Sequence, residues 1–132
     1  MTERVLQCVV LTPDRVIFSG PAEFVVVPLE DGELGIAPGR QELVAELAPG
    51  ELRIRSGGEV ARYYIEEAIA EVIRDRVRIL GRKILRPEEI DGEAAQAMLD
   101  QLLSTRCRSD EELATRDAQI LRLRRQLRIY RA

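Results

Sequence analysis

The residues that could carry chemistry in this chain of 132 residues are mostly acids and arginines. The chain contains no His, the commonest general base and metal ligand, so a Ser or Cys nucleophile would have no imidazole beside it. Lys or carboxylate bases remain possible. However, Lys83 is the only lysine, and no phosphate-loop glycine pattern precedes it. We therefore expect a binding or structural protein rather than an enzyme, with no cofactor, no metal site and no catalytic residue.

The clearest candidate binding feature is an acidic turn between two apolar stretches. Val25 to Val27 form a β-branched run, and Pro28 removes a backbone donor, so this strand must stop or lie at a sheet edge. Glu30-Asp31-Gly32 reverses the chain, because Gly32 is free to adopt a positive φ. Residues 33 to 36 alternate polar and apolar positions and predict a returning strand. An exposed hairpin tip should therefore carry the carboxylates of Glu30, Asp31 and Glu33.

A second candidate is a group of arginines near the end of the chain. From residue 116 onward there are six arginines and one acid, whereas residues 88 to 112 contain eight acids and two arginines. Acids at helix starts and bases in final turns complement the helix dipole, and a solvated charged face is one explanation. Arginines around most of a helix that also has an apolar stripe favour another explanation, an acidic partner. The candidate contact residues are Arg122, Arg124, Arg125, Arg128 and Arg131.

Two kinds of element must position these residues. Short alternating stretches separated by Pro and Gly turns at intervals of about 8–12 residues indicate an antiparallel sandwich up to residue 86. Residues 41–47 fit either a strand or a helical turn. Residues 65–80 fit either an amphipathic helix or two strands joined at Arg74-Asp75-Arg76, and the surrounding β pattern favours strands.

Beyond residue 86 the pattern becomes helical. Asp91 is a plausible cap for a helix whose apolar residues repeat at three- and four-residue spacing: Ala94, Ala95, Met98, Leu99, Leu102 and Leu103. Ser109 and Glu112 read as a capping box for a second helix. One apolar stripe should run the length of that helix through Leu113, Ile120, Leu123, Leu127 and Tyr130. The short connection predicts an antiparallel hairpin over residues 87–132.

Composition restricts the partners and the compartment. The net charge of −3 gives no reason to expect nucleic acid. No apolar run approaches the roughly 20 residues of a membrane span, and the N-terminal residues lack the apolar core of a signal peptide. Cys8 and Cys107 have no spacing pattern and are expected to be free thiols in a reducing compartment.

Several short motifs occur in an order that resembles the epsilon subunit of F-type ATP synthases. They are CVVLTPD (8–14), VIFSG (16–20), EDGELGIAPG (30–39), LAPG (47–50), LRI (52–54), Ile90-Asp91 and QLRI (126–129). The resemblance covers nearly the whole chain. It departs from the family pattern at Arg40-Gln41-Glu42, at Glu66-Glu67-Ala68 and at Gly81-Arg82.

The resemblance implies a non-catalytic rotor subunit. A sandwich over residues 1–86 would contact the gamma subunit and the ring of c subunits, with Glu30, Asp31, Glu33 and Arg40 as the interface candidates. The helical hairpin would regulate ATP hydrolysis and meet the beta subunits through its arginines. The protein would lie on the cytoplasmic face of the inner membrane, attached only through the complex. A free-standing adaptor or ligand-binding module with the same architecture is the alternative.

The resemblance also implies where a nucleotide would bind. Relatives that bind ATP in the hairpin carry an Ile/Leu-Asp-x-x-Arg-Ala motif. Ile90 and Asp91 match its start, but Ala94 stands where the arginine would pair with phosphate. Arg122 could reach a phosphate in a folded-down hairpin, whereas Gln126 replaces a second arginine. Nucleotide binding at Ile90, Asp91 and Arg122 is therefore expected to be weak or absent.

Overall fold

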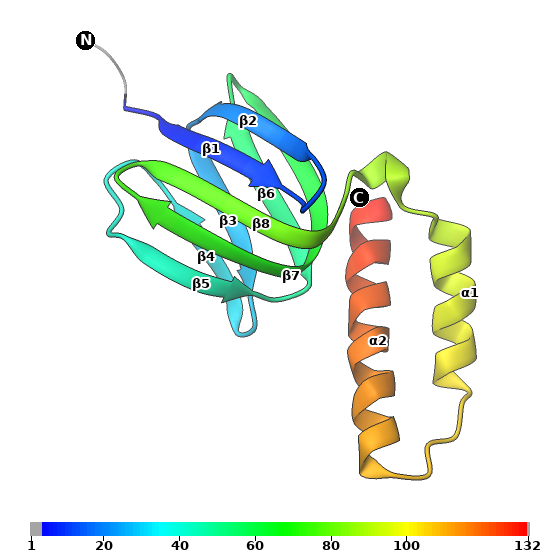
Figure 1. The fold of residues 1–132 in the computed structure, drawn as a ribbon. Helices are drawn as coiled ribbons and strands as arrows, with labels where there is room; N and C mark the ends of the chain where they lie inside the picture. Colours follow the sequence, from blue (N-terminus) through cyan, green and yellow to red (C-terminus); the bar gives the residue numbers. More distant parts are fainter. Residues whose placement is uncertain (1–3, 132) are drawn as a thin grey trace.

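The computed structural model describes residues 4–131 and has two parts, a β-sandwich and a helical hairpin (Figure 1). A 3-10 turn, η1 (Pro87–Glu89), joins the sandwich to the helices α1 (Gly92–Leu103) and α2 (Asp110–Tyr130). The predicted fold class, a β-sandwich followed by a two-helix hairpin, is confirmed. The strands of the sandwich are β1 (Leu6–Leu11), β2 (Val16–Ala22), β3 (Phe24–Leu29), β4 (Gly32–Ile36), β5 (Leu43–Leu47), β6 (Gly50–Ser56), β7 (Glu59–Ile73) and β8 (Arg76–Leu85).

The long strand β7 connects the two layers of the sandwich. The strand order is β2-β1-β8-β7-β6-β3-β4, and β5 pairs with β7 off this path. The first half of β7 pairs with β6, and its second half pairs with β5, while β8 follows it on the other side. Glu67 has a φ of 51°, and it and Arg82 opposite are the only positions left out of a β7–β8 register that is otherwise unbroken between Tyr64 and Ile73, so the backbone is locally irregular where β7 changes partner. Both ambiguous segments, residues 41–47 and 65–80, therefore contain strands.

A tight turn between β7 and β8 is held from outside. Arg74 and Asp75 have positive φ values of 47° and 62°. The Asp75 carboxylate accepts hydrogen bonds of 2.7 Å from the backbone N–H of Gly39 and from the guanidinium of Arg4. These two bonds lower the pKa of Asp75. The turn after β4 is thereby attached to the turn before β8.

One detail differs from the sequence-based expectation: the strands β1 and β8 pair in parallel, so the sheet is not wholly antiparallel. For β3 the sequence left two alternatives open, and the edge position is the one found, since the strand continues through Pro28 to Leu29. Pro28 pairs only with Glu33 of β4, because the pairing of β3 with β6 ends at Val26. Its missing N–H therefore removes no bond between β3 and β6.

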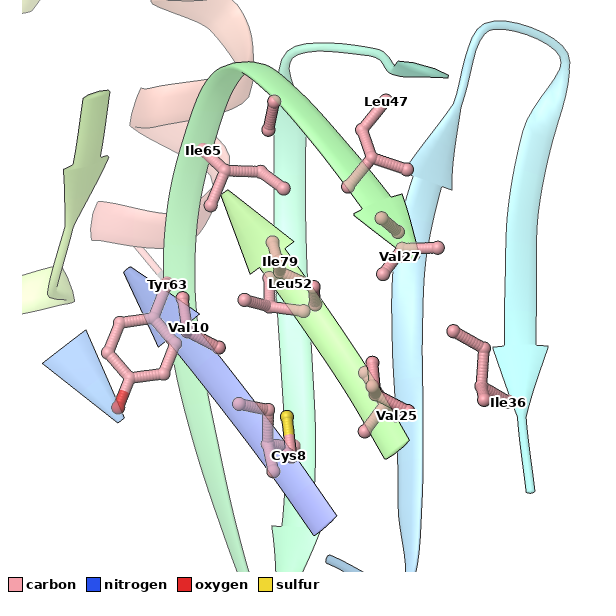
Figure 2. Close-up of a cluster of buried hydrophobic side chains, with 14 of the residues drawn as sticks. Cys8, Val10, Val25, Val27, Ile36, Leu47, Leu52, Tyr63, Ile65 and Ile79 are labelled. Carbon is pink, nitrogen blue, oxygen red and sulfur yellow. The ribbon is translucent and has the colours of Figure 1, made fainter. Parts of the chain in front are cut away.

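The sandwich has a continuous apolar core, which Figure 2 shows as side chains from both layers pointing toward one another. Cys8 and Val10 of β1 meet Val25 and Val27 of β3 in this core. Burial raises the pKa of the Cys8 thiol to about 12. Cys8 thus acts as a small apolar residue, and both cysteines are free, as predicted.

The hairpin has a separate and smaller core, formed by Ala95, Leu99, Ile120, Leu123 and Leu127. Its caps are the predicted ones. The Asp91 side chain accepts from the N–H of Ala94 at 3.0 Å, and Ser109 accepts from the N–H of Glu112 at 3.1 Å. The apolar stripe of α2 is shorter than predicted, because Leu113 and Tyr130 at its ends are exposed. On α1, Met98 and Leu103 of the predicted apolar face are exposed as well.

Candidate functional site

The acidic tip lies at the exposed turn between β3 and β4. Glu30, Asp31 and Glu33 are all exposed, as expected. The ring of Phe24 packs over Gly35, and a Cβ at this glycine would lie only 2.6 Å from the Phe24 Cζ atom. Glycine is therefore required in β4 because an aromatic ring, rather than another backbone, approaches it.

Glu33 is not a free carboxylate. It binds Arg53 of β6 through both oxygens, at 2.9 Å and 3.2 Å. Arg53 also donates to Glu51 at 2.8 Å, and Glu51 accepts in turn from Arg62 of β7. Hydrogen bonding to Glu33 and then to Glu51 raises the pKa of Arg53. A chain of alternating charges therefore links the tip to the middle of the sandwich surface.

Arg40 is not part of the tip. It is exposed in the turn that follows β4, at the end of this strand opposite to Glu30 and Asp31. Its backbone N–H donates to the carbonyl of Ala37 at 3.2 Å. One small contact patch cannot include both Arg40 and the acidic turn.

The hairpin is docked on the sandwich through α2, which lies between α1 and the strands in Figure 1. A small buried cluster is formed by Tyr64 of β7, Ile90 of the segment between η1 and α1, and Ile129 of α2. Leu85 packs against it. This cluster is separate from the sandwich core and from the hairpin core. The contact between the two parts is therefore apolar at its centre and small.

Polar groups surround this docking cluster. The Tyr64 hydroxyl donates to the carboxylate of Glu66, and burial followed by this bond raises the pKa of Tyr64 well above its usual range. The Nε atom of Arg122 lies 3.9 Å from the same carboxylate. An ion pair that is partly open to solvent contributes about 0–1 kcal/mol, so the apolar contacts dominate the docking free energy.

The five candidate arginines of α2 point in different directions in the docked hairpin. Arg122 faces Glu66, and Arg125 lies over Gly50 of β6. Arg128 lines the same cavity as Arg125, next to the acidic tip. Arg131 donates to Gln96 of α1, and Arg124 is exposed on another side of the helix. They therefore do not form one basic face in this state.

The residues expected to hold a nucleotide weakly do not surround a common cavity. Ile90 is buried in the docking cluster, Asp91 caps α1, and Arg122 faces Glu66. Part of the polar surface beside α2 was not predicted from the sequence, namely Glu51, Arg53, Arg62, Tyr64 and Glu66. The alternation of charged and apolar residues in β6 showed that Glu51 and Arg53 share a face, but not what lies opposite.

No helix among residues 4–131 is long and apolar enough to cross a membrane. The same part of the chain holds no group of three residues placed to bind a metal ion.

The sandwich part of the chain matches the model of a known domain family. The model for the β-sandwich domain of the ATP synthase delta/epsilon chain matches residues 5–87. The ATP synthase epsilon chain of Rhodopirellula baltica is 32% identical over 126 residues, which cover 96% of this chain and 98% of the relative. That of Desulforudis audaxviator is 35% identical over 117 residues, covering 89% and 80%. The chain belongs to the epsilon chain family of F-type ATP synthases.

Solved structures share the fold. One is a chain of the Euglena gracilis mitochondrial ATP synthase, in a structure of OSCP, F1 and c-ring, with a TM-score of 0.83 at 22% sequence identity. The match covers 91% of this chain and 78% of the Euglena chain. A chain of the Tetrahymena thermophila mitochondrial enzyme, in a structure of the central stalk and c-ring, has a TM-score of 0.75 at 12% identity, covering 98% and 99%. Both matches extend over the sandwich and the hairpin.

Proposed function

We propose that this protein is a non-catalytic subunit of the rotor stalk, which couples the gamma subunit to the c-ring and regulates ATP hydrolysis through its hairpin. The observation that carries this proposal is the family membership together with the docked hairpin. The beta subunits would be the further partners of the hairpin, and the protein would lie on the cytoplasmic face of the membrane. Catalysis and proton passage would belong to other subunits.

The two separate cores support a movable hairpin. The sandwich core includes no residue of α1 or α2, and the hairpin core includes none from the strands. Residues 4–86 therefore have the contacts of a domain that folds alone, and residues 87–131 those of an appendage. The docking cluster and two weak ion pairs, Arg122 with Glu66 and Arg15 with Glu89, connect them, so the docked and released states should differ by only a few kcal/mol. On release, Arg122, Arg125 and Arg128 would become available to an acidic partner.

An exposed apolar strip on the outer face of β5, β7 and β8 supports a stalk position for the sandwich. Ile69 of β7 lies directly opposite Leu80 of β8, and both side chains are about 40% exposed. Val44 of β5 and Ile73 of β7 lie on the same face and are also exposed, with the charged pair Glu71 and Arg78 between them. We assign this strip to the gamma subunit and the acidic turn to the polar loops of the c-ring. Exposed apolar residues of this kind mark protein contact sites.

Deletion of the hairpin tests the proposal. A chain ending before Pro87 should fold, join the ATPase complex and raise its rate of ATP hydrolysis. The measurements are co-purification with the complex and hydrolysis at several nucleotide concentrations, with the full chain as control. Failure of the full chain to co-purify would reject the stalk role and favour a free-standing adaptor. Normal assembly with unchanged hydrolysis under every nucleotide condition would make the hairpin a structural clasp.

A further inference from the structure

A basic surface lies at the end of the sandwich away from the hairpin, where the β7–β8 turn meets the loop after β4 (Figure 1). We call it the basic corner, and it consists of four exposed arginines, Arg4, Arg40, Arg74 and Arg76. Arg4 pairs with Asp75 at 2.7 Å. The other three have no carboxylate within 4.0 Å among residues 4–131. With Glu42 of the same loop included, four arginines stand against two acids, so the corner keeps an excess of positive charge.

The turn between β7 and β8 places an arginine where its backbone is strained. Arg74 and Asp75 form a two-residue loop in which both residues have a positive φ, 47° and 62°. Such loops favour Asn, Asp or Gly, because a longer side chain crowds its own backbone at positive φ. Asp75 meets this preference, and Arg74 does not. Strained residues of this kind occur preferentially at functional positions, so we attribute Arg74 to its guanidinium group rather than to the turn.

Asp75 fixes the position of the basic corner. One of its carboxylate oxygens accepts from the N–H of Gly39 and the other from Arg4, each at 2.7 Å. Its backbone carbonyl accepts from the N–H of Gln7 at 2.8 Å. Asp75 therefore ties three segments together, namely the residues around the start of β1, the loop after β4 and the start of β8.

The basic corner continues the apolar strip of β5, β7 and β8. Ile73, which belongs to the strip, pairs with Arg76 across the β7–β8 hairpin. Val44, at the other side of the strip, lies four residues after Arg40. A protein that covers the strip would therefore also contact the corner.

We propose that the basic corner binds an acidic segment of the partner protein that covers the apolar strip, and that Asp75 is the positioning residue that holds the corner for it. This rests on the proposed function, which assigns the strip to the gamma subunit. Charges at the rim of an apolar contact guide the encounter and fix its register. The corner lies at the end of β4 opposite to the acidic turn that we assign to the c-ring, so a protein segment fits it better than a lipid surface.

Binding of the full chain to the ATPase complex prepared without this subunit tests the corner. The Kd is measured at several salt concentrations, since exposed charge pairs are screened by salt. The double variant R40Q/R76Q should raise the Kd about three- to twentyfold at low salt, and less as salt is added. Arg74→Asn should raise it about two- to fivefold without lowering the thermal stability, because Asn suits a turn with positive φ. R106Q/R108Q is the matched control, since it removes the same charge from the exposed loop between α1 and α2, and it should leave the Kd unchanged.

Asp75→Asn separates positioning from simple charge. The substitution removes a negative charge, so attraction alone would make an acidic partner bind more tightly. Loss of the contacts that hold Arg4 and Gly39 should instead raise the Kd about two- to fivefold and reduce its dependence on salt. Circular dichroism of each variant confirms that the fold is intact.

The outcomes distinguish the corner from the stalk role. If R40Q/R76Q has no effect, or the same effect as R106Q/R108Q, while the full chain binds the complex, the corner is overturned and the stalk role stands. Tighter binding of Asp75→Asn would overturn its positioning role. Binding of the full chain to vesicles of equal parts phosphatidylcholine and phosphatidylglycerol, lost in R40Q/R76Q, would overturn the protein partner in favour of a membrane. Failure of the full chain to bind the complex at any salt concentration would reject the stalk role and this proposal with it.

Discussion

Replacing Ile129 with Ala should release the hairpin from the sandwich without unfolding either part. The side chain is 2% exposed and contacts Tyr64 and Ile90 in the docking cluster. Truncation of a buried Ile to Ala costs about 2–5 kcal/mol, and the lower end is used here because the cluster has only three buried members and its two parts can separate. The ion pairs of Arg122 with Glu66 and of Arg15 with Glu89 are partly open to solvent and contribute about 0–1 kcal/mol each. A loss of about 2 kcal/mol shifts the ratio of docked to released hairpin about thirtyfold.

Hydrogen exchange measured by mass spectrometry reports this shift. Faster exchange is expected in α1, in α2 and around Tyr64 of β7, while the strands that hold Cys8 and Val25 keep their protection. Leu121→Ala is the control, because Leu121 lies on the same helix and is 42% exposed. It should leave the exchange of β7 unchanged. If Ile129→Ala leaves the exchange around Tyr64 as in the parent, the cluster does not control docking and the reasoning fails.

Three further predictions concern the sandwich. Ile69→Glu should weaken assembly with the ATPase complex in a pull-down. Val60→Glu is the control and should not weaken it, because Val60 is 53% exposed but lies outside the apolar strip. Equal effects of the two variants would contradict the assignment of the strip to the gamma subunit. A thiol reagent should modify Cys107 in the native protein and reach Cys8 only on unfolding, because burial keeps the Cys8 thiol protonated. Rapid labelling of both cysteines would contradict the burial of Cys8. Because the pKa of Asp75 is lowered in the folded state, its stabilising contribution is present above about pH 3.8 and is lost as the pH falls through the folded value. In urea melts between pH 7 and pH 3, Asp75→Asn should therefore lower the stability at pH 7 and flatten its decline toward pH 3, and an unchanged profile would refute this.

Local features of the fold could be predicted from the sequence because they depend on neighbouring residues. The acidic tip follows from a turn of Glu, Asp and Gly between apolar residues, and it is exposed as predicted. The two helix caps follow from the hydrogen-bonding side chains of Asp91 and Ser109. The lack of His, with a single lysine and no phosphate-loop pattern, made binding a better expectation than catalysis.

Pairings between distant segments could not be predicted in this way. The parallel pairing of β1 with β8 joins residues about seventy positions apart, and no turn between them indicates its direction. The periodicity of residues 65–80 fits a helix as well as strands, and the pairing of β7 with β5, β6 and β8 makes this segment two strands joined by a turn. Tertiary hydrogen bonds and burial outweigh local propensity in such a segment.

The candidate site divides in the same way. The sequence by itself determined that arginines surround the last helix and that acids lie at the tip. Only the tertiary structure decided that Glu33 binds Arg53, because the strand registers bring β4 and β6 to either side of β3. It also decided which arginines face the sandwich. Successive residues of a helix are about 100° apart around its axis, so Arg124 and Arg125 diverge, and only the docking of Ile129 on Tyr64 sets which of them faces the cavity.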